Sequence, residues 1–251
     1  MSTLTQRLLA EGLGSFFLVV SVLGAGRMVD VLNAGDALGL LMIAICVGAV
    51  LVAAIAALGP VSGAHFNPVV SLVMVLRGQL PLREAPLYIA AQFLGAVGGA
   101  LTANVMFGAP ALAVSSVERG SAGVWLGEAA ATFGLVVVIV LLVDHHRGQW
   151  IPAGVGLWIV AGHIFTSSTS FANPAVTVGR MFTDASNGIS PESGLWFIPF
   201  QILGGLLAWG VGQALRPRAQ TGFTSDDGGD GGDGGDGGGP EGHSKLTHKT
   251  D

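Results

Sequence analysis

Two short Asn-Pro motifs constrain this chain more than any other feature. The first is Asn67-Pro68-Val69 and the second is Asn173-Pro174-Ala175. Each follows an apolar segment and opens a stretch too short to cross a bilayer, which requires about 20 residues. Asparagine is a good helix N-cap, and proline fits the first helical turn. The pair therefore predicts two half-helices, near 68–77 and 174–184, that meet inside a membrane.

The composition supports this interpretation. Of the 251 residues, 51% are hydrophobic and 11% are charged, whereas soluble domains carry about 25% charged residues. Six apolar segments are long enough, or nearly so, to cross roughly 30 Å of hydrocarbon as helices. We place them near 6–26, 38–58, 84–107, 122–143, 150–166 and 194–215. We therefore expect an all-α integral membrane protein with six transmembrane helices and two re-entrant half-helices.

The second half of the chain repeats the first. Glu11 and Phe16 are matched by Glu128 and Phe133, with the same five-residue spacing. The two motif asparagines are 106 residues apart (173 − 67), and Gln92 and Gln201 form a further matched pair. Each half then holds three spans and one Asn-Pro loop. Because three is odd, the halves insert with opposite topology, and such an inverted repeat places the solute path at its interface.

The expected organisation has three parts. The first inverted repeat covers 1–110 and the second covers 111–216. The remaining 217–251 form a Gly- and Asp-rich tail with almost no apolar residues, which cannot bury a core and is expected to be disordered. Its aspartates are interpreted as a solvated segment and not as a cation site.

The basic residues predict the orientation in the membrane, because cytoplasmic loops are enriched in Lys and Arg. Six arginines flank one side and three flank the other: Arg7, Arg77, Arg83, Arg147, Arg216 and Arg218 against Arg27, Arg119 and Arg180. With an even number of spans, both termini are expected in the cytoplasm. We expect a multi-pass protein of the inner (plasma) membrane.

The sequence gives no indication of an enzyme. It contains no nucleotide-binding, metal-ligand or nucleophile pattern, and its one cysteine, Cys46, excludes an intrachain disulfide and a multi-cysteine metal site. We expect no cofactor, no metal and no nucleic-acid partner. The expected partners are small neutral solutes and the lipid bilayer.

The half-helix arrangement predicts which solutes can pass the midplane of the membrane. Helix N-termini carry a partial positive charge, so the meeting point repels cations and accepts neutral dipoles. Asn67 and Asn173 can donate to a passing oxygen, which disfavours a proton wire.

Non-helical loops in hydrocarbon need acceptors for their N–H groups. Glu11 and Glu128 can supply them; the alternative is that each lies at the interface and reaches water.

The residues around the first motif resemble a known family. Ser62-Gly63-Ala64-His65-Phe66-Asn67-Pro68 is similar to the first signature loop of the major intrinsic proteins, the aquaporin family, and the likeness covers 6–215. The resemblance implies a homotetramer with one pore per subunit. It also implies that Glu11 and Glu128 support the pore-loop backbones, and that His65 lines the cytoplasmic vestibule.

Two departures from the family pattern bear on selectivity. Val69 stands where alanine is usual, and Val176 stands where water and glycerol channels usually place an arginine. The remaining constriction positions, carried over by spacing, are Val47, Ala161 or Gly162, and Ser170, with His163 as a further candidate in the fifth span. Such a ring is expected to be wider and more apolar than a water-only filter.

Arg180 lies one helical turn beyond Val176. Two interpretations remain open from the sequence. Arg180 either replaces part of the missing charge, or lies at the outer mouth and holds the loop.

The region 165–189 is similar to a bacterial subgroup of the family that includes channels linked to arsenic resistance. The resemblance implies arsenous acid, a neutral and glycerol-like molecule, as a solute. We therefore predict a passive channel for small uncharged solutes, including glycerol-like molecules and arsenous acid, with some water. The alternatives are a water or glycerol facilitator without a metalloid role, a closed-pore junction protein and a proton-coupled transporter.

Overall fold

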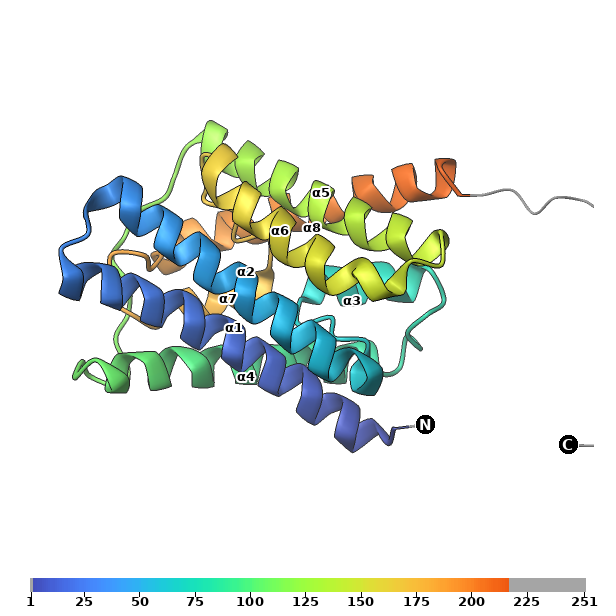
Figure 1. Cartoon of the computed structure of the whole chain (residues 1–251), viewed down its shortest axis with the longest axis horizontal. Helices are drawn as coiled ribbons and strands as arrows, with labels where there is room; N and C mark the ends of the chain where they lie inside the picture. The colour runs from blue at the N-terminus through green and yellow to red at the C-terminus, as the bar shows by residue number, and fades with distance from the viewer. Residues whose placement is uncertain (1, 217–251) are drawn as a thin grey trace, which may run out of the picture. The chain divides into compact units, whose positions relative to one another are not determined.

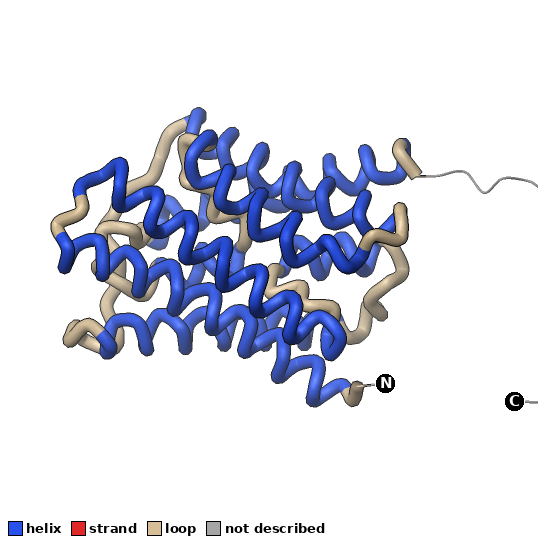
Figure 2. Tube along the Cα trace, viewed as in Figure 1, coloured by secondary structure: helices blue, strands red, loops and turns tan. Residues whose placement is uncertain are grey.

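Six long helices form most of the molecule (Figure 1). The computed structural model describes residues 2–216, and within them every regular element is helical (Figure 2). The long helices are α1 (Leu4–Leu32), α2 (Gly35–Ser62), α4 (Ala85–Met106), α5 (Ala122–Asp144), α6 (Ile151–Phe165) and α8 (Pro191–Ala214). The predicted all-α membrane fold is confirmed, and the predicted tail over 217–251 lies outside the described residues.

Five of these helices are long and apolar enough to cross a membrane. The sixth, α6, has 15 residues and a length of about 22 Å, and the 3-10 helix η1 (Gly148–Trp150) leads directly into it. Each of the six overlaps one of the predicted spans. Large apolar side chains are exposed on their outward faces, among them Leu9, Leu41, Leu94, Leu126, Leu157 and Leu203.

Helix α1 is longer than its predicted span, which ended at 26. The predicted span ended one residue before Arg27. Arg27 pairs with Asp184, with 2.5 Å between Nη2 and Oδ1. The helix therefore continues to Leu32, where Asn33 ends it in the left-handed conformation (φ 49°).

The long helices pack in matched pairs. Helix α1 packs on α4, α5 packs on α8, and α2 packs on α6. Glycine permits close approach in the first two pairs: a Cβ on Gly95 would lie 2.0 Å from the Gly12 carbonyl oxygen, and one on Gly204 would lie 2.3 Å from that of Ala129. Small residues allow such contacts in membrane bundles. The two halves therefore use equivalent packing and belong to one compact unit.

Two short helices lie among the long ones (Figure 1). They are α3 (Pro68–Leu76) and α7 (Pro174–Arg180); they contact each other, and both pack on α4 and α8. Helix α7 ends four residues before the predicted limit of 184. The Phe182 carbonyl accepts a hydrogen bond from Asn104 Nδ2 at 2.8 Å, which fixes the chain in a loop instead of a further helical turn.

Candidate functional site

The two motif asparagines cap the short helices. Asn67 and Asn173 are extended (φ −152° and −160°), and the proline that follows each of them occupies the first helical turn. The Asn67 side-chain oxygen accepts from the Val69 N–H at 2.9 Å, and that of Asn173 accepts from the Ala175 N–H at 2.9 Å. The local sequence thus accounts for both half-helix starts.

Each asparagine also holds the opposite loop. Asn67 Nδ2 donates to the Ala172 carbonyl at 2.8 Å, and Asn173 Nδ2 donates to the Phe66 carbonyl at 2.7 Å. This crossed pair of bonds joins the two halves at one point. An amide nitrogen carries two hydrogens, so each side chain keeps a second donor, and both residues line the central cavity.

The loops before the two motifs have the same unusual backbone. Ala64 and Phe66 are left-handed (φ 50° and 49°), as are Ser170 and Ala172 (φ 49° and 50°). These residues lie three positions and one position before the respective asparagine. The left-handed conformation costs a non-glycine residue roughly 1–2 kcal/mol, so the surrounding structure must hold both loops in place.

Glu11 and Glu128 provide that support. Glu11 accepts the N–H groups of His65 at 2.9 Å and Phe66 at 2.7 Å. Glu128 accepts the N–H groups of Phe171 and Ala172, each at 2.9 Å. Both glutamates are fully buried, so neither reaches water at an interface. The structure places them where the backbone of each loop needs an acceptor.

A glutamine completes each support, and the sequence analysis assigned it no role. Gln92 Nε2 donates to Glu11 at 2.7 Å and to Ser71 Oγ at 2.9 Å. The second half contains the same arrangement, formed by Gln201, Glu128 and Thr177 at 2.6 and 2.9 Å. Two features of the sequence could have identified these glutamines. They occupy matched positions in the repeat, and each is a polar residue inside an apolar span, where a partner is expected.

One cavity of about 700 Å³ runs past both motifs. On α2 it is lined by residues at four-residue spacing, from Val47 to Gly59, which corresponds to about 18 Å of helix. On α6 the same spacing recurs at Val155, Ile159 and His163. These residues make a mostly apolar wall, which also includes side chains of α1 and α5: Leu18, Val22, Leu135, Ile139 and Val143.

The loops before the two motifs supply a polar wall of the cavity. Gly63, Ala64, His65, Ser170 and Phe171 line the cavity, and their carbonyl oxygens accept no hydrogen bond from the residues that the structure describes. These oxygens are available to a solute. Because the glutamates take the loop N–H groups, the polar wall offers mainly acceptors, with the asparagine amides as donors between them.

The charged side chains that line the described cavity are Arg7 and Arg180; no Asp or Glu lines it. Arg7 is paired with Glu84, with 2.7 Å between Nη1 and Oε2. Arg180 makes no ion pair with a described carboxylate. Among the described residues, the cavity lining therefore has no carboxylate that would attract a cation, and both of its charged side chains are positive.

Of the three fifth-span candidates, the one that lines the cavity is His163. Ala161 is exposed on the outer surface of α6, and Gly162 is buried beside Ser170, where a Cβ would lie 2.6 Å from Oγ. His163 lines the cavity instead. Spacing from the motif gave three adjacent candidates and could not choose among them, because neighbouring residues of a helix point about 100° apart.

The other predicted constriction residues, Val47, Ser170 and Val176, all line the cavity, as does His65. His65 Nδ1 lies 3.1 Å from Ser71 Oγ. The remaining motif residues, Pro68, Val69, Pro174 and Ala175, are buried and do not line the cavity. The departure at Val69 has a local compensation, because a Cβ on Gly205 would lie 2.2 Å from Val69 Cγ1; the glycine provides the space for the larger side chain.

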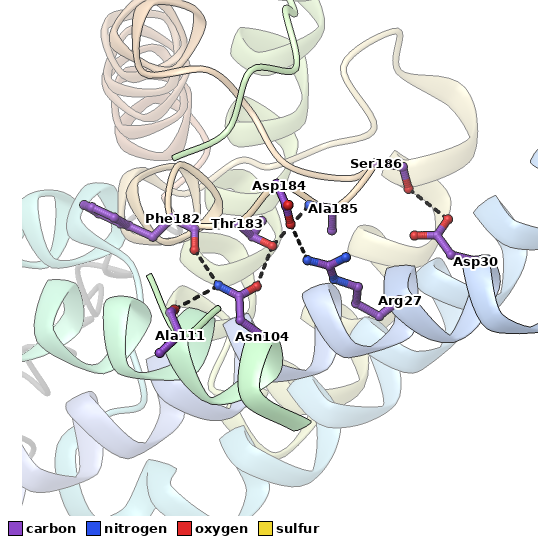
Figure 3. A network of polar contacts seen from close by, with 9 residues as sticks. All are labelled: Arg27, Asp30, Asn104, Ala111, Phe182, Thr183, Asp184, Ala185 and Ser186. Carbon is purple, nitrogen blue, oxygen red and sulfur yellow. Dashed lines mark hydrogen bonds and ion pairs between the residues drawn. The ribbon is translucent and has the colours of Figure 1, made fainter. Parts of the chain in front are cut away.

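The loop after α7 is fixed by a network of polar contacts (Figure 3). Asn104 Nδ2 donates to the Phe182 carbonyl, and Thr183 Oγ1 donates to Asn104 Oδ1 at 2.7 Å. Arg27 of α1 pairs with Asp184 of the same loop at 2.5 Å, and Ser186 Oγ donates to Asp30 of α1 at 3.3 Å. Sequence reasoning assigned no role to Asn104, although a buried polar side chain at a span end indicates a partner.

This loop contacts Arg180. The sequence allowed two roles for that residue: to replace part of the missing charge, or to hold the loop at the outer mouth. Arg180 is 3% exposed and lines the cavity. Its Nε donates to the Asn187 carbonyl at 2.7 Å, and its Cζ lies 3.4 Å from the centroid of the Phe171 ring. Arg180 therefore contacts the loop and faces the cavity at the same time.

Comparison with known proteins agrees with this geometry. A family model described as Major intrinsic protein matches residues 1–172. Aquaglyceroporin AqpS of Rhizobium meliloti (strain 1021) is 46% identical over 205 residues, which are 82% of this chain and 88% of that protein. Probable aquaporin AqpM of Archaeoglobus fulgidus is 32% identical over 229 residues, which are 80% of this chain and 92% of that protein.

A solved structure has the same fold. The aquaglyceroporin from Plasmodium falciparum superposes with a TM-score of 0.68 and covers 83% of this chain and 95% of its own, at 22% sequence identity. At this identity the likeness concerns the arrangement of the helices.

Proposed function

Because this chain belongs to the major intrinsic protein family, we propose that it is a passive channel for small uncharged solutes of the glycerol type, with some water. The printed name of the relative from Rhizobium meliloti, aquaglyceroporin, supports this solute class. The structural support comes from the cavity.

The observation that carries the proposal is the mixed lining of the cavity. The pore loops contribute carbonyl oxygens and asparagine amides, and the long helices contribute valine, leucine and isoleucine side chains. A polyol has both hydroxyl and C–H groups, so it can contact both kinds of lining. An inorganic ion would lose hydration against the apolar wall with little compensation.

The asparagine pair supports a channel that passes neutral molecules and does not conduct protons. The second N–H of Asn67 and of Asn173 is available to a solute oxygen in the cavity. A water that accepts from these amides is oriented and cannot readily relay a proton along the file. The N-terminus of α3 at the same level adds a partial positive charge.

We propose that Val47, His163, Ser170 and Val176 form the constriction. None of these side chains is a large aromatic apart from the imidazole, and Val176 leaves the usual arginine position apolar. Pore diameter and lining groups decide which neutral solutes pass. This lining favours molecules larger than water.

Arsenous acid is the finer proposal for the solute. It is neutral at cytoplasmic pH and carries three hydroxyl groups, so it resembles glycerol in shape and hydrogen bonding. The likeness of the region 165–189 to channels linked to arsenic resistance supports it. We propose further that the chain forms a homotetramer in the inner membrane with both termini in the cytoplasm.

A proton-coupled transporter is less well supported. Its relay would need an ionisable group that faces the cavity near the midplane. Glu11 and Glu128 do not line the cavity, and their oxygens accept hydrogen bonds from the loops and from Gln92 and Gln201. Their geometry is that of backbone support.

The test is a swelling series with the purified full-length protein in proteoliposomes. We expect glycerol and arsenous acid to enter faster than in empty vesicles, without an imposed ion gradient, and water to be accelerated as well. Water flux without glycerol flux would reduce the function to a water channel. No accelerated flux of any neutral solute would contradict the proposed function.

A further inference from the structure

A second hollow, away from the central cavity, lies between α5 and α6. It is a groove of about 430 Å³, and none of the described residues lines both spaces. Its lining is entirely apolar, from Val138 and Leu142 on α5 to Gly154 and Leu157 on α6, with Trp150 at one end. Leu157 is 68% exposed, so the groove opens toward the lipid. From Trp150 to Leu157 it follows α6 for about 10 Å, two thirds of the depth of one leaflet.

The packing of α6 keeps the groove open. Helix α6 is held close to α2, where a Cβ on Gly156 would lie 2.7 Å from the Gly48 carbonyl oxygen. On the side of α5, Gly154 leaves the space empty: a Cβ there would lie 3.0 Å from Leu142 Cδ1 and 3.1 Å from Val138 Cγ1. An apolar groove of defined shape that faces hydrocarbon fits an extended acyl chain.

Arg147 lies at the end of the groove where the chain crosses from α5 to α6. Its N–H donates to the Leu142 carbonyl at 2.8 Å, and its carbonyl accepts from the Trp150 N–H at 2.9 Å. Its backbone is therefore bonded to both walls of the groove. The Arg147 side chain is exposed and forms no ion pair with a described carboxylate. Trp150 is 56% exposed, and tryptophan is enriched at the level of lipid headgroups.

The charges around this end of the groove are mostly positive. Asp144 is the only acidic residue between 138 and 157. Arg77 pairs with its Oδ1 through a fully buried side chain, and Arg216 Nε lies 3.5 Å from the same oxygen. Two arginines thus take up the charge of Asp144. The charge of Arg147 remains uncompensated by the described residues.

We propose that this groove binds one anionic phospholipid, with an acyl chain between α5 and α6 and the phosphate at Arg147. The planar guanidinium can bind a phosphate through two hydrogen bonds. A zwitterionic lipid has the same phosphate but also carries an ammonium, so its attraction to Arg147 is weaker. Juxtamembrane basic residues attract anionic lipids in this way. The inference does not depend on which solute passes the central cavity.

A second copy of the chain fits the groove less well. The loop with Arg147, the start of α1 and the end of α8 lie at one end of the molecule (Figure 1). A copy beside it in the membrane would present its own residues from that same end. The described carboxylates there, Glu84 and Asp144, are both paired within the chain. They offer no free partner to Arg147, whereas a lipid phosphate does.

The experiment measures quenching of Trp150 fluorescence by lipids with brominated acyl chains, in proteoliposomes of the full-length protein. The Trp150 signal is the difference between the wild type and Trp150→Phe, which removes the contribution of the other tryptophans. We expect brominated phosphatidylglycerol to bind there about fivefold more strongly than brominated phosphatidylcholine, the preference provided by one arginine near the surface. Equal binding would reduce the groove to an ordinary lipid contact. Absence of quenching by either lipid would mean that a second copy covers it. Both results overturn the proposal.

Arg83 provides a matched control for Arg147. It is also exposed and without a described carboxylate partner, and it precedes Glu84, which pairs with Arg7 near the start of α1. Arg147→Ala should abolish the preference for phosphatidylglycerol, and Arg83→Ala should keep it. Equal losses in the two variants would show that general surface charge attracts the lipid. Both side chains are exposed, so both variants are expected to fold.

The acyl chain is tested separately by Gly154→Leu, which fills the groove and leaves every charge in place. It should remove most of the quenching by phosphatidylglycerol, with glycerol flux unchanged because Gly154 does not line the central cavity. Glycerol 3-phosphate, which has the phosphate without the chains, should not displace the lipid. Full quenching in Gly154→Leu, or displacement by glycerol 3-phosphate, would show that only a phosphate is bound and would contradict the proposal.

Discussion

The two half-helices of the cavity start in the same way and differ one turn later. Residues related by the offset of 106 line the cavity on both: Val70 corresponds to Val176, and Met74 corresponds to Arg180. The caps, the left-handed loop residues and the glutamate supports are duplicated as well. The backbone support is therefore shared, whereas only the second half-helix carries a charged side chain one turn later.

This difference has a physical reason. Buried N–H and carbonyl groups must be satisfied in hydrocarbon, so the residues that hold each loop have few alternatives. Side chains that face the cavity are constrained by the solute instead. His65 of the first loop corresponds to Phe171 of the second, and Met74 corresponds to Arg180. Selectivity can change at such positions without any change in the supporting frame.

The largest expected effect comes from removing the supports. Glu11→Ala and Glu128→Ala each leave two loop N–H groups buried without their acceptor, at about 1–3 kcal/mol for each group. We expect both variants to lose most of the folded protein, measured as the yield of monodisperse material in detergent. A large loss for one glutamate with wild-type yield for the other would show that the two supports are not equivalent.

A smaller effect is expected for the caps. Asn67→Ala or Asn173→Ala removes a cap worth about 1 kcal/mol and the crossed bond to the opposite loop, worth about 1 kcal/mol. Both should lower the thermal midpoint in detergent by similar amounts and reduce glycerol flux. Thr102→Ala is the control, since that hydroxyl bonds only to Gly98 in its own helix, at 2.8 Å. Midpoints equal to the control would contradict the crossed-bond account.

The smallest effect on stability tests a difference between the halves. Val69 corresponds to Ala175, and Gly205 accommodates the larger residue. Val69→Ala should cost about 1.5 kcal/mol through the two methyl groups removed, with glycerol flux retained per folded molecule. The double variant with Gly205→Ala should recover part of the lost stability. No destabilisation by Val69→Ala would mean that the helices close the gap.

Much of the fold was predictable from the sequence, because membrane helices need long apolar segments and half-helices need caps. The boundaries were less predictable. The predicted first span ended one residue before Arg27, whose partner Asp184 lies 157 residues away. The early end of α7 depends on Asn104, a contact across 78 residues. Such long-range partners leave no local pattern.

The candidate site also has residues that the sequence could identify and residues that it could not. Asn67, Asn173 and the two glutamates were identified because buried backbone groups demand particular partners. The fifth-span position was only narrowed to three neighbouring residues, Ala161, Gly162 and His163, of which His163 lines the cavity. The position of the Arg180 side chain could not be predicted either, because it depends on a tertiary hydrogen bond from Nε to the Asn187 carbonyl.

The central claim is that the side chain at Val176 limits which neutral solutes pass. Val176→Arg adds a long, permanently charged group at the proposed constriction, and Val176→Ala is the matched control that only removes bulk. The measurement is the swelling rate of proteoliposomes in glycerol, arsenous acid and water. We predict that Val176→Arg reduces glycerol and arsenous acid fluxes at least about tenfold and water less, while Val176→Ala keeps all three. Unchanged glycerol and arsenous acid fluxes in well-inserted Val176→Arg protein would contradict the account.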